Sequence, residues 1–217
     1  MKKLSLSSTA IFDPQTPASA RRRGNRDSRV PEIIEVSINV LIAAGYAGYT
    51  INRVANDAGI RLSTLQHYFS TREVLLRATI EEIAKRYFER FRKFAENRSR
   101  SPQARLDSIV DDAFADFVGP GLSAGVVETW GLALHESFAR DVVVDVQKQF
   151  SRLFAQLVGE INPELSVEER ELRGELIMSS CQGLVIFLRW CDDDVSRLHA
   201  FRRAIKVVWS GLGKAEE

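Results

Sequence analysis

A run of polar side chains between residues 61 and 67 offers the most distinctive chemistry in this sequence of 217 residues. An arginine can donate two hydrogen bonds to O6 and N7 of guanine, and a glutamine can pair with adenine. An apolar side chain such as Leu62 can pack on a thymine methyl group, although a partly buried position would explain it equally well. The residues that we predict to contact base edges are Arg61, Leu62, Ser63, Thr64, Gln66 and His67.

This polar run is predicted to lie on the second of two short helices within TINRVANDAGIRLSTLQHYF, residues 50–69. Gly59 stands where the first helix must end with positive φ, which glycine adopts without a steric penalty. Ala55 is small enough to let the two helices cross closely, and Leu65 follows Ile60 on the inner side of the second. The pattern is typical of a helix-turn-helix, whose second helix lies in the DNA major groove.

Other residues are better placed for phosphate groups than for bases. Thr50 and Arg72 are expected near helix N-termini, where backbone amides and the helix dipole favour an anion. Tyr68 is expected to close the small core with its ring, and only its hydroxyl would reach DNA. An arginine-rich arm, residues 1 to 28, is expected to follow the phosphate backbone or enter the minor groove; aiding solubility is the alternative. The predicted phosphate contacts are Thr50, Tyr68, Arg72, Arg21, Arg22 and Arg23.

The charge distribution agrees with nucleic-acid contact at the N-terminal end. Residues 1 to 80 hold 11 Lys and Arg against 6 Asp and Glu, a net charge of +5, and the remainder carries −4. The sequence has no spacing typical of a catalytic, phosphate-loop, dinucleotide or metal site, so we expect neither an enzyme nor a cofactor or metal. Cys181 and Cys191 have no zinc-site spacing and indicate a reducing cytoplasm. We recognise no apolar run long enough to span a membrane, and no signal peptide.

Several separate motifs lie in and around the helix-turn-helix: AAGY at residues 43–46, Thr50, HYF at 67–69 and STREVLLRA at 70–78. They follow one another in an order that resembles the TetR family of bacterial transcriptional regulators. The resemblance covers residues 29 to 80 and implies an all-helical fold, DNA binding, and backbone contacts at the positions of Thr50, Tyr68 and Arg72. The chain departs from the common Ser-Lys-Gly-Thr at the start of the second short helix, so the operator sequence does not transfer from a relative.

Helical patterns continue along the chain, and no alternating segment suggests a sheet. The predicted fold class is all-α, with an N-terminal three-helix DNA-binding head and a C-terminal helical domain for ligand binding and dimerisation. Ser70 with Glu73, and Ser166 with Glu169, are predicted capping boxes. We expect the chain to consist of three parts: a basic arm at 1–28, a helix-turn-helix domain at 29–75 and an effector-binding and dimerisation domain at 76–217. After the two short helices, helices are predicted at 71–98, 102–118, 123–138, 141–160, 166–191 and 195–211, and the first helix at 30–44.

The last two predicted helices indicate a second copy of the chain as partner. The segment LIMSSCQGLVIFLRW, residues 176–190, is apolar or small around nearly the whole helix, unlike a helix with one solvent face. A two-fold dimer joined by a four-helix bundle explains this pattern, and a fully internal helix in a monomer is the alternative. A dimer would place two recognition helices about 34–36 Å apart on a near-palindromic, double-stranded operator. The predicted interface residues are Leu176, Ser180, Gly183, Phe187, Trp190, Phe201, Ile205 and Val208.

Aromatic residues in the middle of the chain predict either a packed core or the wall of a ligand cavity. A mostly apolar cavity with a few polar groups suits a small apolar or amphipathic molecule. The family resemblance implies such a cavity but identifies none of its residues. The candidate lining residues are Phe114, Phe117, Trp130, His135, Phe138, Gln147, Phe150 and Cys181.

These features predict a sequence-specific DNA-binding transcriptional regulator. A repressor released by a small-molecule inducer, which favours a dimer whose heads no longer match the operator spacing, is the favoured mechanism. A transcriptional activator fits the same sequence, and a helical protein-binding adaptor without effector control is the other alternative. The salt dependence of the binding affinity distinguishes DNA binding from an apolar protein interface, because phosphate contacts weaken steeply as the salt concentration rises.

Overall fold

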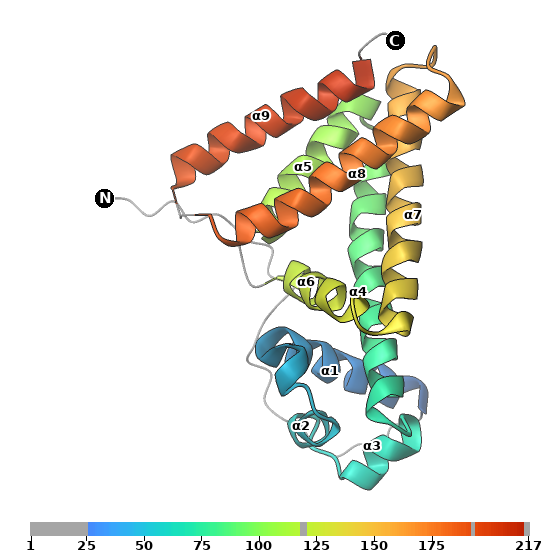
Figure 1. The fold of residues 1–217 in the computed structure, drawn as a ribbon, viewed down its shortest axis with the longest axis vertical. Coiled ribbons are helices and arrows are strands. Elements are labelled where there is room, and N and C mark those ends of the chain that lie inside the picture. The colour runs from blue at the N-terminus through green and yellow to red at the C-terminus, as the bar shows by residue number, and fades with distance from the viewer. Residues whose placement is uncertain (1–25, 118–120, 192–193, 215–217) are drawn as a thin grey trace.

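The computed structural model describes residues 26–117, 121–191 and 194–214, and every regular element within these ranges is an α-helix. Figure 1 shows an elongated molecule with a small N-terminal head at one end and longer helices rising from it. The expected all-α fold is therefore confirmed. The helices are α1 (Arg26–Gly48), α2 (Ile51–Asp57), α3 (Leu62–Tyr68), α4 (Arg72–Ala95), α5 (Pro102–Phe117), α6 (Leu122–Ala133), α7 (Ser137–Ile161), α8 (Val167–Arg189) and α9 (Val195–Lys214).

The head is built by α1, α2, α3 and the first turns of α4 around a small apolar core. Val54 and Ala55 of α2 and Leu65 of α3 are almost completely buried, which holds the two short helices at a close crossing. Gly59 has φ of 63° in the turn between them, so the predicted glycine turn is confirmed. Thr50 is the N-cap of α2 and accepts a hydrogen bond from the backbone N–H of Arg53 at 3.1 Å, so its expected position near a helix N-terminus is confirmed.

A buried group of three hydroxyls joins this head to α4. The Ser37 side chain of α1 lies 2.5 Å from the Tyr49 hydroxyl and 2.7 Å from the Thr79 hydroxyl of α4. Thr79 also donates to the carbonyl of Leu75 at 2.7 Å. Because buried hydroxyls are costly without partners, this group fixes how α1 sits against α4.

The body is a layered bundle in which α4 and α7 run side by side (Figure 1), α8 packs chiefly against α7, and α9 contacts α5, α7 and α8. Phe150 of α7 lies at the centre, with its ring centroid 5.5 Å from Tyr87 and 5.3 Å from Phe91, both on α4. Phe154 joins it to Trp209 of α9, whose indole N–H donates to the Ser180 hydroxyl at 3.1 Å. Aromatic packing therefore connects the C-terminal helix to the helix that starts in the head.

Several predicted boundaries differ from the structure. The helix predicted at 123–138 ends at Ala133, and α7 begins at Ser137, because residues 134–136 form a turn that no Gly or Pro marks. The cap of α4 is Thr71, which accepts from the backbone N–H of Val74, so the predicted capping box at Ser70 is wrong. The predicted N-cap Ser166 is confirmed by its bond from the Glu169 N–H. The expected domain boundary at residue 75 falls inside α4.

The expectation that no segment is long and apolar enough to span a membrane also needs correction. Ser28–Gly48 of α1 passes that test by length and composition. One face of this helix, including Ile34, Ile38 and Leu41, is buried in the head core, whereas Glu32 and Glu35 are exposed on another face. These features are those of a core helix whose sequence is unusually rich in aliphatic and small residues.

Candidate functional site

The outer face of α3 presents a continuous set of polar side chains to solvent. Leu65 points inward, and Tyr68 is half-buried with its ring 5.4 Å from that of His67. Leu62 has 36% of its surface exposed, so it is available at the start of the helix rather than enclosed in the core. Every predicted base-contacting residue is thus accessible on this helix or at its N-cap: Arg61, Leu62, Ser63, Thr64, Gln66 and His67.

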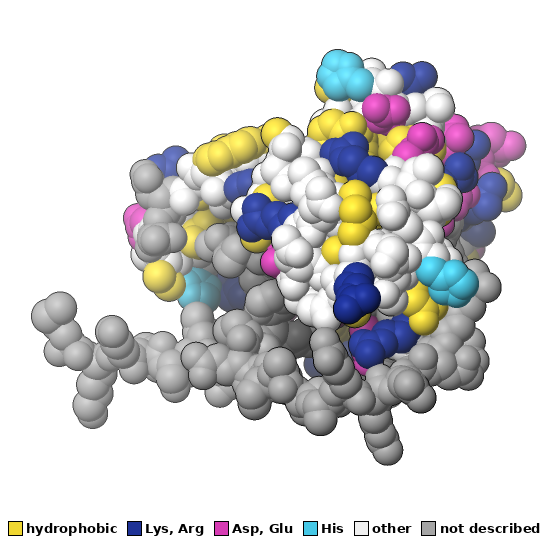
Figure 2. All heavy atoms as spheres, turned by 90° about the horizontal axis from the view of Figure 1, so that it is seen from below, with side chains coloured by type: hydrophobic (Ala, Val, Ile, Leu, Met, Phe, Trp, Pro, Cys, Tyr) yellow, Lys and Arg dark blue, Asp and Glu magenta, His cyan; other side chains and the backbone are white. Residues whose placement is uncertain are grey.

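This face lies at the end of the molecule formed by the head. Figure 2 shows that end directly, with several Lys and Arg side chains spread over an otherwise uncharged surface and most of the visible acidic side chains along one edge. Such a surface suits an anionic polymer. Arg21, Arg22 and Arg23 of the predicted arm lie outside the described residues.

Arg72 is the first residue of α4, near a helix N-terminus as predicted, and its side chain forms hydrogen bonds within the head. Its Nε donates to the carbonyl oxygen of Tyr49 at 3.0 Å, and its Nη2 donates to that of Tyr46 at 3.2 Å. The guanidinium also lies over the Tyr46 ring, 4.5 Å from its centroid. Arg72 therefore stabilises the C-terminal end of α1 through hydrogen bonds within the head. Sequence spacing alone could not show this, because the carbonyls that hold it come from residues more than 20 positions earlier.

A second contact at the same place joins the head to the body. The carboxylate of Glu128, on α6, accepts a hydrogen bond from the backbone N–H of Tyr46 at 2.8 Å. Gly45, with φ of 62°, interrupts α1 at this point, and a Cβ there would lie 3.3 Å from the Glu128 carboxylate oxygens. On the same helix, Gly125 packs closely against Ile83 of α4 and Ile42 of α1. Thus α6 contacts the head through both a charged group and close apolar packing.

The other face of α6 forms one wall of an internal cavity. Val126, Thr129 and Trp130 contribute this wall, and α4, α7 and α8 supply the rest. The cavity volume is about 30 Å³, close to the space needed by one water molecule and far below that of an occupied ligand site. The cavity is therefore too small in this structure to hold a ligand. It is lined by Ile80, Ile83, Ala84, Tyr87, Val126, Thr129, Trp130, Val142, Val143, Val146, Gln147, Met178 and Gln182.

Among the candidate lining residues, the structure brings Trp130 and Gln147 to this cavity and places the others elsewhere. Phe117, Phe150 and Cys181 are buried in the packed core, and burial raises the pKa of the Cys181 thiol to about 12. His135 is exposed in the turn between α6 and α7. Aromatic spacing selected core positions because it cannot distinguish a filled interior from a cavity wall. The remaining two candidates, Phe114 and Phe138, are buried away from the cavity.

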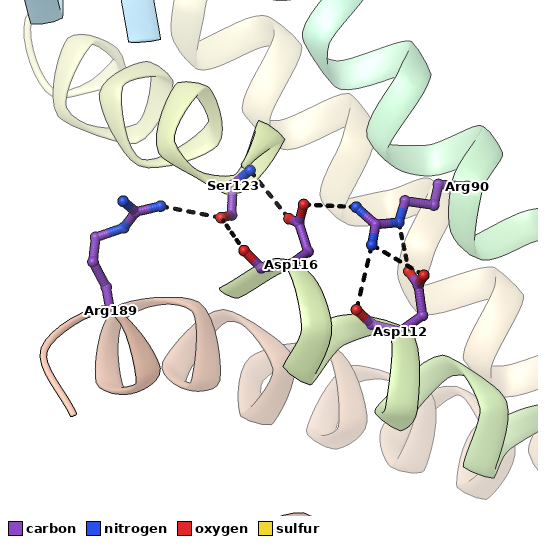
Figure 3. Close-up of polar contacts among 5 residues, drawn as sticks. All are labelled: Arg90, Asp112, Asp116, Ser123 and Arg189. Atoms are coloured by element: carbon purple, nitrogen blue, oxygen red, sulfur yellow. Dashed lines mark hydrogen bonds and ion pairs between the residues drawn. The ribbon is translucent and has the colours of Figure 1, made fainter. Parts of the chain in front are cut away.

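A polar network connects four helices of the body (Figure 3). Arg90 of α4 contacts two carboxylates of α5, with Nε 2.6 Å from Asp112 and Nη1 2.6 Å from Asp116. Asp116 accepts from the Ser123 N–H of α6 at 3.2 Å, and the Ser123 hydroxyl accepts from Arg189 of α8 at 3.0 Å. Burial raises the pKa of Asp112 even though Arg90 lies beside it. The network therefore couples the position of α6 to α4, α5 and α8.

The sequence contained a signal for this network that our prediction missed. Asp112 and Asp116 stand four residues apart, on one face of a helix that is otherwise rich in buried apolar residues. Carboxylates at that spacing on a buried face require a cationic partner, which a search for helical charge patterns would have found.

Comparison with known proteins agrees with the geometry of the head. Residues 33–79 match the model of the bacterial regulatory proteins of the tetR family, and this segment contains α2, α3 and the junction with α4. The chain belongs to the TetR family.

A relative matches this chain by sequence beyond the head, and solved structures share its fold. The HTH-type transcriptional regulator BetI of Burkholderia thailandensis is 28% identical over 145 residues, which cover 64% of this chain and 73% of BetI. A TetR transcription regulator from Haloarcula marismortui has a TM-score of 0.69 at 18% identity, covering 85% of this chain and 98% of that one. The multidrug binding protein EbrR, solved with malachite green, has a TM-score of 0.63 at 16% identity, covering 86% and 99%. This TetR-family protein is a DNA-binding transcriptional regulator.

The TetR-family chain also presents an apolar face formed by α8 and α9. Trp190 is 70% exposed, Phe187 53% and Val208 54%, which is unusual for large apolar side chains. Leu176 and Gly183 of the predicted interface are exposed as well, whereas Ser180 is half-buried and faces Trp209 of α9. Phe201 and Ile205 are half-buried, with the Phe201 ring 5.9 Å from that of Phe114. Sequence analysis did not select Leu172, Ile186 or Val207, which the structure also leaves exposed.

Proposed function

We propose that this protein is a homodimeric transcriptional repressor that leaves a near-palindromic operator when a small molecule enters the cavity between α4, α6, α7 and α8. The observation that supports this mechanism most directly is the double role of α6. One face of the helix lines the cavity through Val126 and Trp130, and another holds the head through Glu128. A molecule that opened the cavity would displace α6 and alter its contact with Tyr46.

The proposed domain roles follow from this arrangement. Residues 29–75 bind DNA, with Arg61 and Gln66 as the main base readers and Thr50 and Tyr68 as phosphate contacts. Residues 76–217 bind the effector and dimerise through the exposed face of α8 and α9. The protein works in the cytoplasm, where its cysteines, both free in the structure, stay reduced.

A binding experiment tests DNA recognition first. Fluorescence anisotropy would compare a duplex covering the DNA upstream of the protein's own gene with a scrambled duplex, each at two salt concentrations. We expect selective binding that weakens steeply with salt. Arg61→Ala and Gln66→Ala should each reduce the discrimination between bases by about 1–3 kcal/mol. Lys93→Ala, an exposed position near the far end of α4, is the matched control and should change nothing. Equal binding of both duplexes by the wild-type protein would contradict sequence-specific recognition at this site.

The oligomeric state tests the proposed dimer. Leu176→Arg places a charge in the middle of the apolar face and should convert the dimer seen in sedimentation velocity to monomer. Leu134→Arg is the control, because Leu134 is 74% exposed in the turn after α6, outside that face. A monomeric wild-type protein, or equal behaviour of the two variants, would contradict the proposed interface.

A further inference from the structure

We propose that the ligand of the cavity is an uncharged, mostly apolar molecule with one oxygen atom that accepts a hydrogen bond from the hydroxyl of Tyr87. This inference rests on the proposed function, in which the same cavity takes the inducer. It adds the chemical class of the ligand and the residue that recognises its polar group.

The composition of the cavity wall excludes a charged ligand. None of the described lining residues is an Asp, Glu, Lys, Arg or His. Arg90, about one turn of α4 beyond Tyr87, is already paired with Asp112 and Asp116. An ionised group entering this space would lose its hydration without gaining a counter-charge, which makes its transfer from water unfavourable.

Tyr87 supplies a buried hydroxyl that can donate a hydrogen bond to a ligand. Its side chain is only 4% exposed, and its hydroxyl has no hydrogen-bond partner among the described residues. Burial raises the pKa of Tyr87 well above its ordinary value, so the phenol stays protonated and available as a donor. Thr129 differs, because its hydroxyl already donates to the carbonyl of Gly125 at 2.8 Å. An oxygen acceptor on the ligand would remove the cost of the unpaired Tyr87 hydroxyl.

The burial of the wall indicates that the site must open to be filled. Ile80, Ile83 and Met178 are buried, whereas Gln147 is exposed and Trp130 is half-buried. Since the cavity now holds about 30 Å³, a ligand must displace part of this wall. Met178 can rearrange at low cost because its side chain is unbranched and flexible. The exposed α6–α7 side is where the wall would move.

Four monosubstituted benzenes of similar size test the ligand class directly. Acetophenone is neutral with one carbonyl oxygen, isopropylbenzene is neutral without one, benzoate is an anion and phenyltrimethylammonium is a cation. Ligand-observed NMR on the full-length protein would measure the dissociation constant of each, without DNA present. We expect acetophenone to bind at least about tenfold more tightly than either ion, because the ions have no counter-charge in the wall. A charged probe that binds as tightly as acetophenone would overturn the inference.

Two sets of variants test the role of Tyr87 and the location of binding. Tyr87→Phe should weaken acetophenone about 3- to 10-fold and leave isopropylbenzene unchanged, since it removes a single neutral hydrogen bond. The variant should fold, because it deletes a hydroxyl that has no described partner. Val146→Trp, which fills the cavity from α7, should abolish binding of both neutral probes. Val144→Trp, two residues away and outside the cavity, should keep it.

The outcomes separate this inference from the proposed function. If acetophenone binds with the expected Tyr87 dependence but does not release operator DNA, the ligand class stands and the induction mechanism fails. If an ionic probe releases the DNA and competes with acetophenone, induction stands and the ligand class fails. Equal weakening of acetophenone and isopropylbenzene by Tyr87→Phe, or no binding of any probe at millimolar concentration, also overturns the inference.

Discussion

The hydrogen bond between Glu128 and the Tyr46 backbone provides the sharpest test of the proposed coupling between the cavity and the DNA-binding head. Replacing Glu128 by alanine removes a half-buried, charge-assisted bond of 2.8 Å. Such bonds contribute about 1.5–3 kcal/mol, which corresponds to about 10- to 150-fold in the equilibrium between docked and undocked heads. That range is an upper bound on the loss of operator affinity, because removing the bond shifts the docking equilibrium by no more than the free energy of the bond. We expect the dissociation constant for the operator to rise by about 5- to 50-fold.

Fluorescence anisotropy with an operator duplex would measure this change, and Glu128→Gln is the matched control. Glutamine keeps an oxygen acceptor at the same position and loses only the charge, so its effect should stay below about fivefold. Binding to non-operator DNA should be nearly unaffected, since the outer face of α3 stays intact. A Glu128→Ala protein with a lower melting temperature but wild-type operator affinity would refute the reasoning, because the contact would then be structural only.

Three further predictions concern stability and reactivity. Gly174→Ala should lower the free energy of unfolding by about 1–3 kcal/mol in urea titrations, because its Cβ would lie 2.6 Å from a backbone oxygen of α7. Burial alone would raise the pKa of Glu160, but hydrogen bonds, chiefly from Arg105, lower it overall. The stabilisation by Glu160 is therefore present above the ordinary glutamate pKa and lost as pH falls through the lowered value, so Glu160→Gln should lose less stability than wild type in that acid range. Cys181, whose pKa is raised to about 12, should resist alkylation in the folded protein while half-exposed Cys191 reacts, and Cys191→Ser should leave no fast-reacting thiol.

The parts of this protein that sequence analysis could predict are those determined by local patterns. Gly59, Thr50 and the exposed face around Gln66 follow from turn chemistry, capping and helical spacing within one short segment. Long-range partners had no such signal. The guanidinium of Arg72 is oriented by the carbonyl oxygens of Tyr46 and Tyr49. The residues next to Arg72 in the sequence give no indication of these two partners.

The cavity shows the same limit in another form. Phe150 and Trp130 are both aromatic residues on helices, but Phe150 fills the core and Trp130 borders the cavity. The difference depends on how α6 crosses α4 and α7, which residue spacing along one helix cannot specify. Hydrophobic periodicity identifies the inward face of a helix, and only the assembled packing tells whether that face meets another side chain or a space.

If the proposed ligand acts through this cavity, the small volume of the cavity implies that the ligand concentration needed for induction is separable from the selectivity of the site for its ligand. A ligand that binds only the opened form has its affinity reduced by the fraction of molecules already open; if that fraction were about 1%, the loss would be about 100-fold. Residues such as Met178 that influence opening can therefore shift the concentration at which genes respond, without changing the operator read by α3 or the chemistry offered by Tyr87. Single substitutions in the core would then change the ligand concentration at which the protein responds, independently of its DNA and ligand selectivity.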